Sequence, residues 1–369
     1  MSSNAANNMP TLAYIAERTM TAECTLNYLK ENGAFFSSRK CKEGSEMRLN
    51  QSSRDGFFWR CGSTTCACGR SRISYLDGSF FQGRKSIIHQ TLLVVYLFLL
   101  QVPNGTISTM TGLSLPTVRS IVKDIYQVME ADLRIEDVQV GGVGSNGQSI
   151  VVEIDESKFG KRKYNKGKRV DGVWVVGGVE RTPERKVFLL TVPNRNQNTL
   201  KLIIDTFAKD GSLVMVDCWK GHKGIDSDPS RNLVVQTVNH SKAFRDPKTG
   251  ACTNTIEGTW NGIKRGVTSR HRTASMMPWK LVEFIWRRKH AGNHWKAMLA
   301  CFSQVSFTRA GIADQGPLVS LLTTVFEDAT GDQGDEEPFI FISDDDSDSE
   351  SDENDTSAPS TPVKKLRSA

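Results

Sequence analysis

The stretch from Ser149 to Gly160, SIVVEIDESKFG, constrains the fold of this chain more than any other. Its apolar and polar positions alternate with a period of two, which predicts a β-strand. Asp155 falls at the end of this strand, shortly before a basic loop that runs from Lys161 to Arg169. A carboxylate at a strand end lies at the edge of a sheet, where a neighbouring strand can bring a second carboxylate beside it.

The same alternation of apolar runs and polar breaks continues through residues 149–310, as expected for an α/β domain. The run SLVMVDCWKGH predicts a short buried strand that ends at Asp217. The phrase TNTIEGTWNGIKRG predicts a helix that carries Glu257. The other expected elements are strands at 173–179, 187–192 and 233–238 and a helix at 198–208.

The order of these elements predicts that Asp155, Asp217 and Glu257 meet at one edge of one sheet. Such a set can hold two Mg²⁺ or Mn²⁺ ions about 3.5–4 Å apart, which activate the attacking oxygen and stabilise the leaving oxygen of a phosphodiester. Lys264 follows Glu257 by seven residues on the same helix face, where it can contact DNA phosphate. Taken singly, the three acids have simpler explanations as a strand-end cap, a turn residue and a surface charge.

At these residues the chain resembles the Merlin-type DDE transposases and their bacterial insertion-sequence relatives. The matching phrases are EIDESKFGKRKYNKG, WVVGGVER, VDCWKGH, VNHSKAF with DPKTG, and TNTIEGTWNGIKRG. The resemblance implies an RNase H-like mixed sheet flanked by helices. It also implies that Asp155, Asp217 and Glu257 are the catalytic metal ligands and that Lys264 is the basic residue that follows them.

Four other residues compete for a place in this site. Glu153 shares the face of Asp155 but lies deeper in the strand, and Glu156 is expected on the opposite face. Some members of the resembled family have Asn in place of the Glu, so Asn254 is an alternative third ligand. The resemblance also makes His240 a motif residue that either lines the site or belongs to the core.

Four cysteines gather in a Gly-rich segment at residues 34–84, where little helix is expected. Two turns that supply ligand pairs would give zinc its tetrahedral geometry. The first turn is incomplete, because Gly44 stands where a second ligand is expected, so Cys24 or His89 is an alternative ligand; buried unligated thiols are the simpler explanation. DGFFWRCGSTTC and the later DGSFF resemble the family's zinc-ribbon region. We therefore predict a zinc-ribbon-like module with ligands Cys41, Cys61, Cys66 and Cys68.

Residues 85–135 are expected to form a DNA-binding region that contains a helix-turn-helix at 106–127. Gly112 suits the turn, where a positive φ angle is often required. Ser114 can cap the second helix, with Pro116 in its first turn. An ordinary helical hairpin would show the same pattern.

Each of these two helices is expected to turn one apolar face to a core. Ile107 and Met110 are the core positions of the first helix. Arg119 and Lys123 lie off the apolar stripe of the second helix and can meet DNA phosphates or base edges. The stripe itself consists of Val118, Ile121, Val122 and Ile125.

Charge is distributed very unevenly along the chain. From Glu327 to Asp355 there are 14 acidic residues and no Lys or Arg. Residues 1–326 therefore carry 44 Lys and Arg against 27 Asp and Glu, a net charge of +17. A body that is so basic suits a polyanion such as nucleic acid, although a basic surface without a specific partner is the simpler alternative.

The segment 327–369 is expected to be a disordered acidic tail, and residues 1–33 a partly disordered segment with some helix. FIFIS, from Phe339 to Ser343, precedes the acidic run and resembles a SUMO-interacting motif, in which a peptide adds to a sheet edge. A solvated tail with a chance apolar spot is the alternative. A SUMO partner would imply a eukaryotic host and a nuclear location.

No apolar run is long enough for a membrane span, since the run at 91–102 fits a buried helix, and we expect no membrane association. The sequence predicts a transposase that cleaves and joins DNA strands at terminal inverted repeats, and the pairing of two ends favours a homo-oligomer. A domesticated, non-catalytic DNA-binding regulator is the alternative. An RNase H-type nuclease would share the metal site but would leave the N-terminal modules unexplained.

Overall fold

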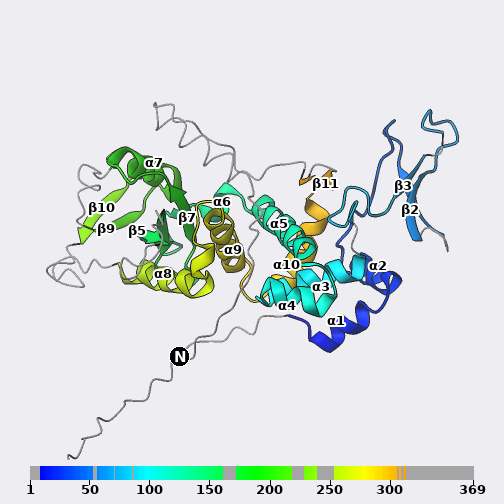
Figure 1. Ribbon diagram of the computed structural model, residues 1–369. Helices are drawn as coiled ribbons and strands as arrows, with labels where there is room; N and C mark the ends of the chain where they lie inside the picture. Colours follow the sequence, from blue (N-terminus) through cyan, green and yellow to red (C-terminus); the bar gives the residue numbers. More distant parts are fainter. Residues whose placement is uncertain are drawn as a thin grey trace, which may run out of the picture. The chain divides into compact units, whose positions relative to one another are not determined.

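The computed structural model of the chain describes residues 9–52, 56–69, 71–84, 87–160, 172–217, 228–238, 253–305, 307–308 and 311–312 (Figure 1). All of these residues belong to one compact unit, Met1–Gly334. The expected tail at 327–369 and its FIFIS motif lie outside the described residues, so both remain predictions. No helix in the described ranges is long and apolar enough to cross a membrane.

The first part of the chain combines two short helices with a three-stranded antiparallel sheet. Thr11 and Thr21 cap the helices by accepting hydrogen bonds from backbone amides three residues later. Strand alternation turns Met47, Trp59 and Cys61 into the core and leaves the opposite face exposed. The elements are α1 (Leu12–Arg18), α2 (Ala22–Glu31), β1 (Met47–Ser52), β2 (Gly56–Cys61) and β3 (Arg72–Ser74), with β2 in the centre of the sheet.

The expected helix-turn-helix pattern is present as α4 (Asn104–Thr111) and α5 (Leu115–Asp132), preceded by the buried helix α3 (Ile88–Leu99). Gly112 ends α4 with a φ of 69°, and the Ser114 side chain accepts a hydrogen bond from the third residue beyond it. The four stripe residues of α5 are all buried, as predicted. The prediction for Met110 was wrong, because the core side of the short α4 runs through Ile107 and Thr111 and leaves Met110 52% exposed.

A five-stranded mixed sheet forms the centre of the second part of the chain. Its order is β10-β9-β5-β6-β7, in which β5, β6 and β7 are antiparallel neighbours and β5, β9 and β10 run parallel. The predicted strands are thus confirmed, but the prediction that Asp155 ends its strand was wrong, because β5 stays paired with β6 for four more residues, to Phe159. Their bounds are β5 (Val151–Phe159), β6 (Val173–Glu180), β7 (Val187–Val192), β9 (Leu213–Asp217) and β10 (Val234–Val238).

Two helices cover opposite faces of this sheet (Figure 1). α7 (Gln197–Phe207) packs on one face through the stacked rings of Phe207 and Phe188. α8 (Asn254–Gly266) packs on the other face, where its Trp260 meets Phe159. The shorter elements are α6 (Ile135–Val138), β4 (Val140–Gly141), β8 (Ala208–Lys209), η2 (Pro229–Arg231), η3 (Ser269–His271), β11 (Phe307–Thr308) and β12 (Gly311–Ile312).

α9 (Met277–Lys289), followed by α10 (His294–Gln304), connects the helical part to the mixed sheet, since α9 contacts both α5 and β7. The contact with α5 includes a buried polar group. The Glu283 carboxylate accepts hydrogen bonds from Lys280 at 3.0 Å, Arg287 at 2.9 Å and the Tyr126 hydroxyl at 3.3 Å. Arg287 also donates to the last carbonyls of α3, so the polar group as a whole ties α3, α5 and α9 together.

Candidate active site

The register of the mixed sheet places Asp155 and Asp217 at the same level. β5 and β9 pair in parallel from Val151 with Leu213 to Glu153 with Met215. Two residues further along each strand are Asp155 and Asp217, so the register puts their backbones at one level of the sheet. Asp217 is the last residue of β9, whereas Asp155 lies in the middle of β5, which continues to Phe159. The Asp155 side chain is partly exposed.

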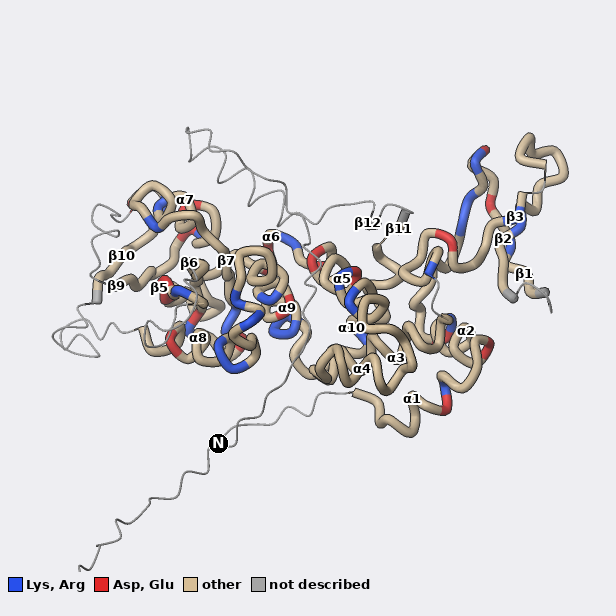
Figure 2. The backbone as a smooth tube through the Cα atoms, in the orientation of Figure 1, with Lys and Arg blue, Asp and Glu red and all other residues tan. Residues whose placement is uncertain are grey.

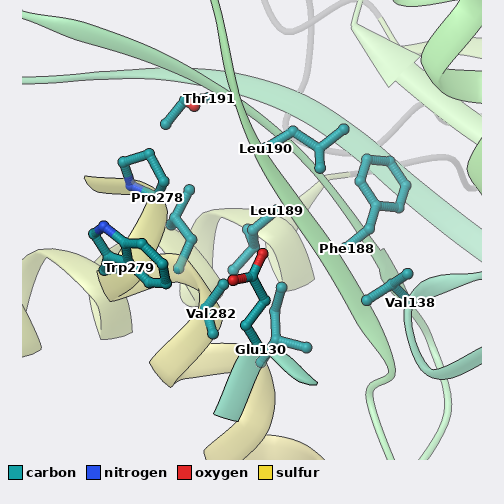
Figure 3. Close-up of a pocket in the computed structure, with 11 residues that line it drawn as sticks. Glu130, Val138, Phe188, Leu189, Leu190, Thr191, Pro278, Trp279 and Val282 are labelled. Atoms are coloured by element: carbon teal, nitrogen blue, oxygen red, sulfur yellow. The ribbon is translucent and has the colours of Figure 1, made fainter. Parts of the chain in front are cut away.

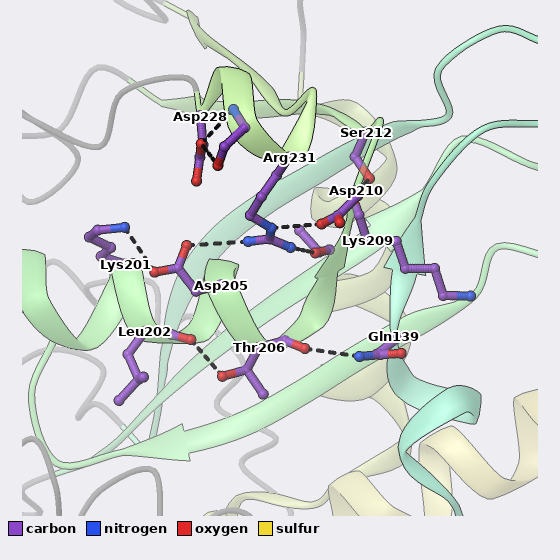
Figure 4. Close-up of polar contacts among 12 residues, drawn as sticks. Gln139, Lys201, Leu202, Asp205, Thr206, Lys209, Asp210, Ser212, Asp228 and Arg231 are labelled. Atoms are coloured by element: carbon purple, nitrogen blue, oxygen red, sulfur yellow. Dashed lines mark hydrogen bonds and ion pairs between the residues drawn. The ribbon is translucent and has the colours of Figure 1, made fainter.

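The start of β9 is held firmly by polar contacts from the residues around it (Figure 4). Arg231 forms ion pairs with Asp210 at 2.7 Å and Asp205 at 3.3 Å, and its backbone carbonyl accepts a hydrogen bond from Gly211. Ser212 accepts a hydrogen bond from the Gly142 amide at 2.7 Å. These contacts fix where β9 begins, and thereby how far along the sheet its last residue lies.

Glu153, two residues before Asp155, holds the start of α8 against the sheet. Its Oε2 accepts hydrogen bonds from the backbone amides of Thr255 at 2.7 Å and Ile256 at 2.9 Å. Arg181 donates to its other oxygen, and the side chain is fully buried. The amides concerned lie in the first turn of the helix, where N–H groups lack intrahelical partners. A carboxylate from β5 therefore caps the helix that carries Glu257.

Trp260 joins α8 directly to Asp155. Its indole Nε1 donates a hydrogen bond to Asp155 Oδ2 at 2.9 Å, and the ring is buried. The ring fits because Gly177, the β6 partner of Asp155, has no side chain; a Cβ there would lie 2.7 Å from the Trp260 ring and 2.8 Å from Leu189. The WVVGGVER phrase thus includes a glycine that the close approach of α8 requires.

Glu257 and Lys264 extend the same helix beside Asp155. Glu257 is exposed in the first turn of α8, one turn before Trp260. The Lys264 ammonium lies 5.7 Å from the centre of the Phe159 ring, on the face of β5 that carries Asp155. The described part of the site therefore brings a carboxylate from the middle of β5 to the side of the sheet that is covered by α8, the helix of Glu257 and Lys264.

The competing residues have separate places. Glu156 lies on the opposite face of β5, where its side chain is 3% exposed and its carboxylate is 4.0 Å from Arg195. Asn254 is exposed as the first residue of α8. His240 lies outside the described residues. The role of Glu153 was not foreseen; its position in the middle of an apolar strand was the available signal, because a buried carboxylate requires partners.

The four cysteines of the predicted zinc module come together. The sulfur atoms of Cys41, Cys61, Cys66 and Cys68 all lie within 4.8 Å of one another. Hydrogen bonds close both turns, since the Gly44 amide donates to the Cys41 carbonyl and the Gly69 amide to the Cys66 carbonyl. Both glycines have positive φ, which explains why Gly44 stands where a ligand was expected.

The chemistry of this cysteine group fits a soft divalent metal. Hydrogen bonds, first of all from the Ser71 side chain, lower the pKa of Cys68 to about 6, which favours the thiolate that metals bind. Four sulfur ligands at this spacing could hold zinc. The alternative ligands are not in the group, because Cys24 is exposed on α2 and His89 belongs to α3.

The predicted DNA-contacting residues of the second helix lie on its outer side. Arg119 is exposed and Lys123 is half-buried, both off the apolar stripe of α5. An apolar pocket lies elsewhere, between β7 and α9, lined by Trp279, Val282 and residues 188–191, with Glu130 at its wall (Figure 3). Since β7 is two strands away from β5, this pocket is separate from the carboxylate edge.

Carboxylates gathered in one site are typical of enzymes that transfer phosphoryl groups with metal ions. Comparison with known families is more specific: residues 145–289, from just before β5 to the end of α9, match the model of the ISXO2-like transposase domain. This match supports a DDE-type transposase family.

Two further comparisons add little. No curated protein matches the chain. Among solved structures, an intasome of simian T-cell lymphotropic virus in complex with PP2A regulatory subunit B56 gamma is 12% identical, covering 53% of this chain and 67% of that chain. Its TM-score of 0.26 is too low for the likeness to carry an argument.

Proposed function

We propose that this chain is a DDE transposase that cleaves and joins DNA strands at the terminal inverted repeats of a transposon. The observation that carries the proposal is that Asp155 and Asp217 lie at one level of two neighbouring strands, with α8 bonded to Asp155 through Trp260, within the segment that matches a transposase domain. The strand order, with three antiparallel strands followed by two parallel ones, supports an RNase H-like fold of the Merlin type.

Asp155, Asp217 and Glu257 are the proposed ligands of Mg²⁺ or Mn²⁺. Oxygen ligands from a few carboxylates suit these hard cations, and the partial exposure of Asp155 and Glu257 leaves room for water and substrate phosphate. The bound ions would supply activation of the attacking oxygen and stabilisation of the leaving oxygen. Trp260 orients the Asp155 carboxylate by its hydrogen bond, and Glu153 fixes the start of α8, the helix that carries Glu257, against the sheet.

The remaining basic residues and modules are assigned to the binding of DNA. Lys264 would contact phosphate beside the cleaved bond, and Arg119 and Lys123 would contact DNA from α5. Zinc on the four cysteines would stabilise the N-terminal module. We further propose a homo-oligomer, because two transposon ends must be joined, and a nuclear location in a eukaryotic host.

The test is a strand-transfer assay with the DNA ends that flank the coding region, in Mg²⁺ or Mn²⁺. We expect Asp155→Asn, Asp217→Asn and Glu257→Gln each to lower the rate at least 100-fold, because each removes a metal ligand. Glu184→Gln, which changes an exposed acid between β6 and β7, is the matched control and should retain the wild-type rate.

A second candidate is a domesticated DNA-binding regulator without catalysis, which the acidic, Ser-rich C-terminal sequence favours. The same assay separates the two functions. If the wild-type protein binds the ends but its strand transfer equals that of Asp155→Asn, the catalytic proposal is overturned and the regulator is supported.

A further inference from the structure

The exposed face of the three-stranded sheet carries a row of three arginines. The register pairs Arg48 of β1 with Arg60 of β2, and Arg60 with Arg72 of β3. Arg48, Arg60 and Arg72 are all exposed, so one guanidinium-bearing side chain from each strand stands at the same level of the sheet. We call these three residues the arginine row; Figure 2 shows blue segments, which are Lys or Arg, near the β2 and β3 labels.

The three strands themselves contain no acidic residue. β1 reads MRLNQS, β2 reads GFFWRC and β3 reads RIS. Like charges directly opposite one another in a sheet destabilise it. Protection of the sheet edges against aggregation would explain Arg48 and Arg72, but it does not require a charge at Arg60 on the central strand.

A neighbouring aromatic ring helps to position the row. The guanidinium carbon of Arg72 lies 3.7 Å from the centre of the Phe58 ring, on the same face of the sheet. Stacking on an aromatic ring restricts the orientations of a guanidinium. The opposite face of the sheet is anchored in the core by Trp59 and Met47, so the row stands on a rigid support.

We propose that the arginine row is a phosphate-contacting surface for duplex DNA. Neighbouring strands lie about 4.8 Å apart, so the row is about 10 Å long. Phosphates advance about 3.4 Å along the duplex axis per nucleotide of one strand, so the row spans the rise of about three phosphates. Arginine forms bidentate hydrogen bonds with phosphate, which suits this partner. The surface contacts the backbone and reads no base sequence.

This inference rests on the proposed function, since it takes DNA as the substrate. The test compares the full-length wild-type protein with the triple variant Arg48→Gln, Arg60→Gln, Arg72→Gln in binding to duplex DNA over a series of salt concentrations. The matched control is Arg134→Gln, Lys201→Gln, Lys296→Gln, which removes three exposed basic groups outside the sheet. Zinc content and circular dichroism establish that each variant is folded.

We expect the slope of log affinity against log salt to fall by about 2–3 in the arginine-row variant and to stay unchanged in the control, because each lost phosphate contact removes about 0.9. The loss should be equal for the transposon end and for an unrelated duplex. A folded arginine-row variant with the wild-type slope would overturn the inference. So would an unchanged slope combined with loss of binding to a synthetic peptide of residues 344–355, which would assign the row to the acidic segment.

The two proposals can fail separately. Asp155→Asn should lose strand transfer but keep the wild-type salt slope. The arginine-row variant should have a reduced salt slope but retain strand transfer at low salt. Strand transfer that depends on Asp155, together with an unaltered slope in the arginine-row variant, would remove only the inference. A reduced slope in that variant without any strand transfer by the wild type would remove only the proposed catalysis.

Discussion

Glu153 and Trp260, rather than the expected metal ligands, position the elements of the candidate site. Glu153 is fully buried and accepts hydrogen bonds from two α8 amides and from Arg181. Removal of a partner from such a group typically costs about 3–5 kcal/mol, so this buried carboxylate has a structural role. Asp155 is partly exposed on the same face of β5, with one oxygen oriented by Trp260.

Gly177→Ala should displace Trp260 and thereby disturb Asp155. The added Cβ would lie 2.7 Å from the Trp260 ring, so the helix or the ring must move. We expect a loss of about 1–3 kcal/mol in the free energy of unfolding, measured with denaturant, and at least a tenfold loss of strand transfer. Gly258→Ala on α8 is the control. A Cβ at that position meets open space, so the free energy of unfolding should be unchanged or raised.

At the scale of elements, helix ends are joined by charge as well as by apolar packing. The C-terminal end of α5 is tied to the end of α9 through Asp132, which accepts hydrogen bonds from His290 at 2.7 Å and Lys289 at 3.1 Å. Burial alone would raise the pKa of Asp132, but these two partners outweigh it and lower the pKa to about 2. The contact therefore stabilises the fold whenever the carboxylate is ionised.

Asp132 should contribute to stability above pH 4 and lose that contribution as the pH falls from about 4 to 2. The sign follows because the folded-state pKa lies below the ordinary value of 3.8, so the unfolded chain binds the proton first. The contribution at neutral pH is about 2 kcal/mol. Unfolding free energies of the wild type and Asp132→Asn, measured between pH 2 and 7, should converge at the acidic end; parallel curves would contradict the assignment.

The cysteine module is an element whose stability should depend on metal. Its sheet is small, and each sulfur lies within 4.8 Å of the other three. We expect one zinc per chain by elemental analysis, and we expect a strong chelator or Cys66→Ser to remove it and to unfold the β1–β3 sheet. Cys24→Ser, which changes an exposed thiol on α2, should leave the zinc content unaltered. Full zinc content in the Cys66 variant would refute this ligand set.

At the scale of the whole molecule, α9 joins the helical part to the mixed sheet through a buried polar group. Burial raises the pKa of Glu283, but Lys280 and Arg287 outweigh this and lower it, so the carboxylate is ionised. Burial and the same carboxylate raise the pKa of Tyr126 well above its usual value, which keeps its hydroxyl protonated as a donor. One hydrophobic core cluster contains residues of both parts, including Val122 of α5 and Val176 of β6.

Glu283→Gln should therefore weaken the whole fold rather than one helix. The change leaves two buried cations without their counter-charge, and we expect a loss of about 3–5 kcal/mol in the free energy of unfolding. Calorimetry should show whether the two parts still unfold together. Glu184→Gln, at an exposed position, should change stability by less than about 0.5 kcal/mol. A Glu283 variant as stable as this control would show that the polar group contributes nothing.

The elements and their order were predictable from local pattern. Period-two alternation placed β5 and β6, and Gly112 with Ser114 marked the turn between α4 and α5, because backbone geometry at these points depends on neighbouring residues alone. Cysteine spacing indicated a metal module for the same reason, since the ligand turns are local.

Contacts between distant residues could be decided only by the fold. The burial of Glu153 and the partial exposure of Asp155 depend on where α8 begins, more than a hundred residues later in the chain. A local sequence pattern contains no information about contacts at such a separation. The prediction that Met110 is a core residue was wrong for a related reason. An eight-residue helix buries one narrow face, and the elements packed against it determine which face that is. The arginine row is likewise a product of strand register: its members are twelve residues apart along the chain, and pairing across β1, β2 and β3 sets them in line.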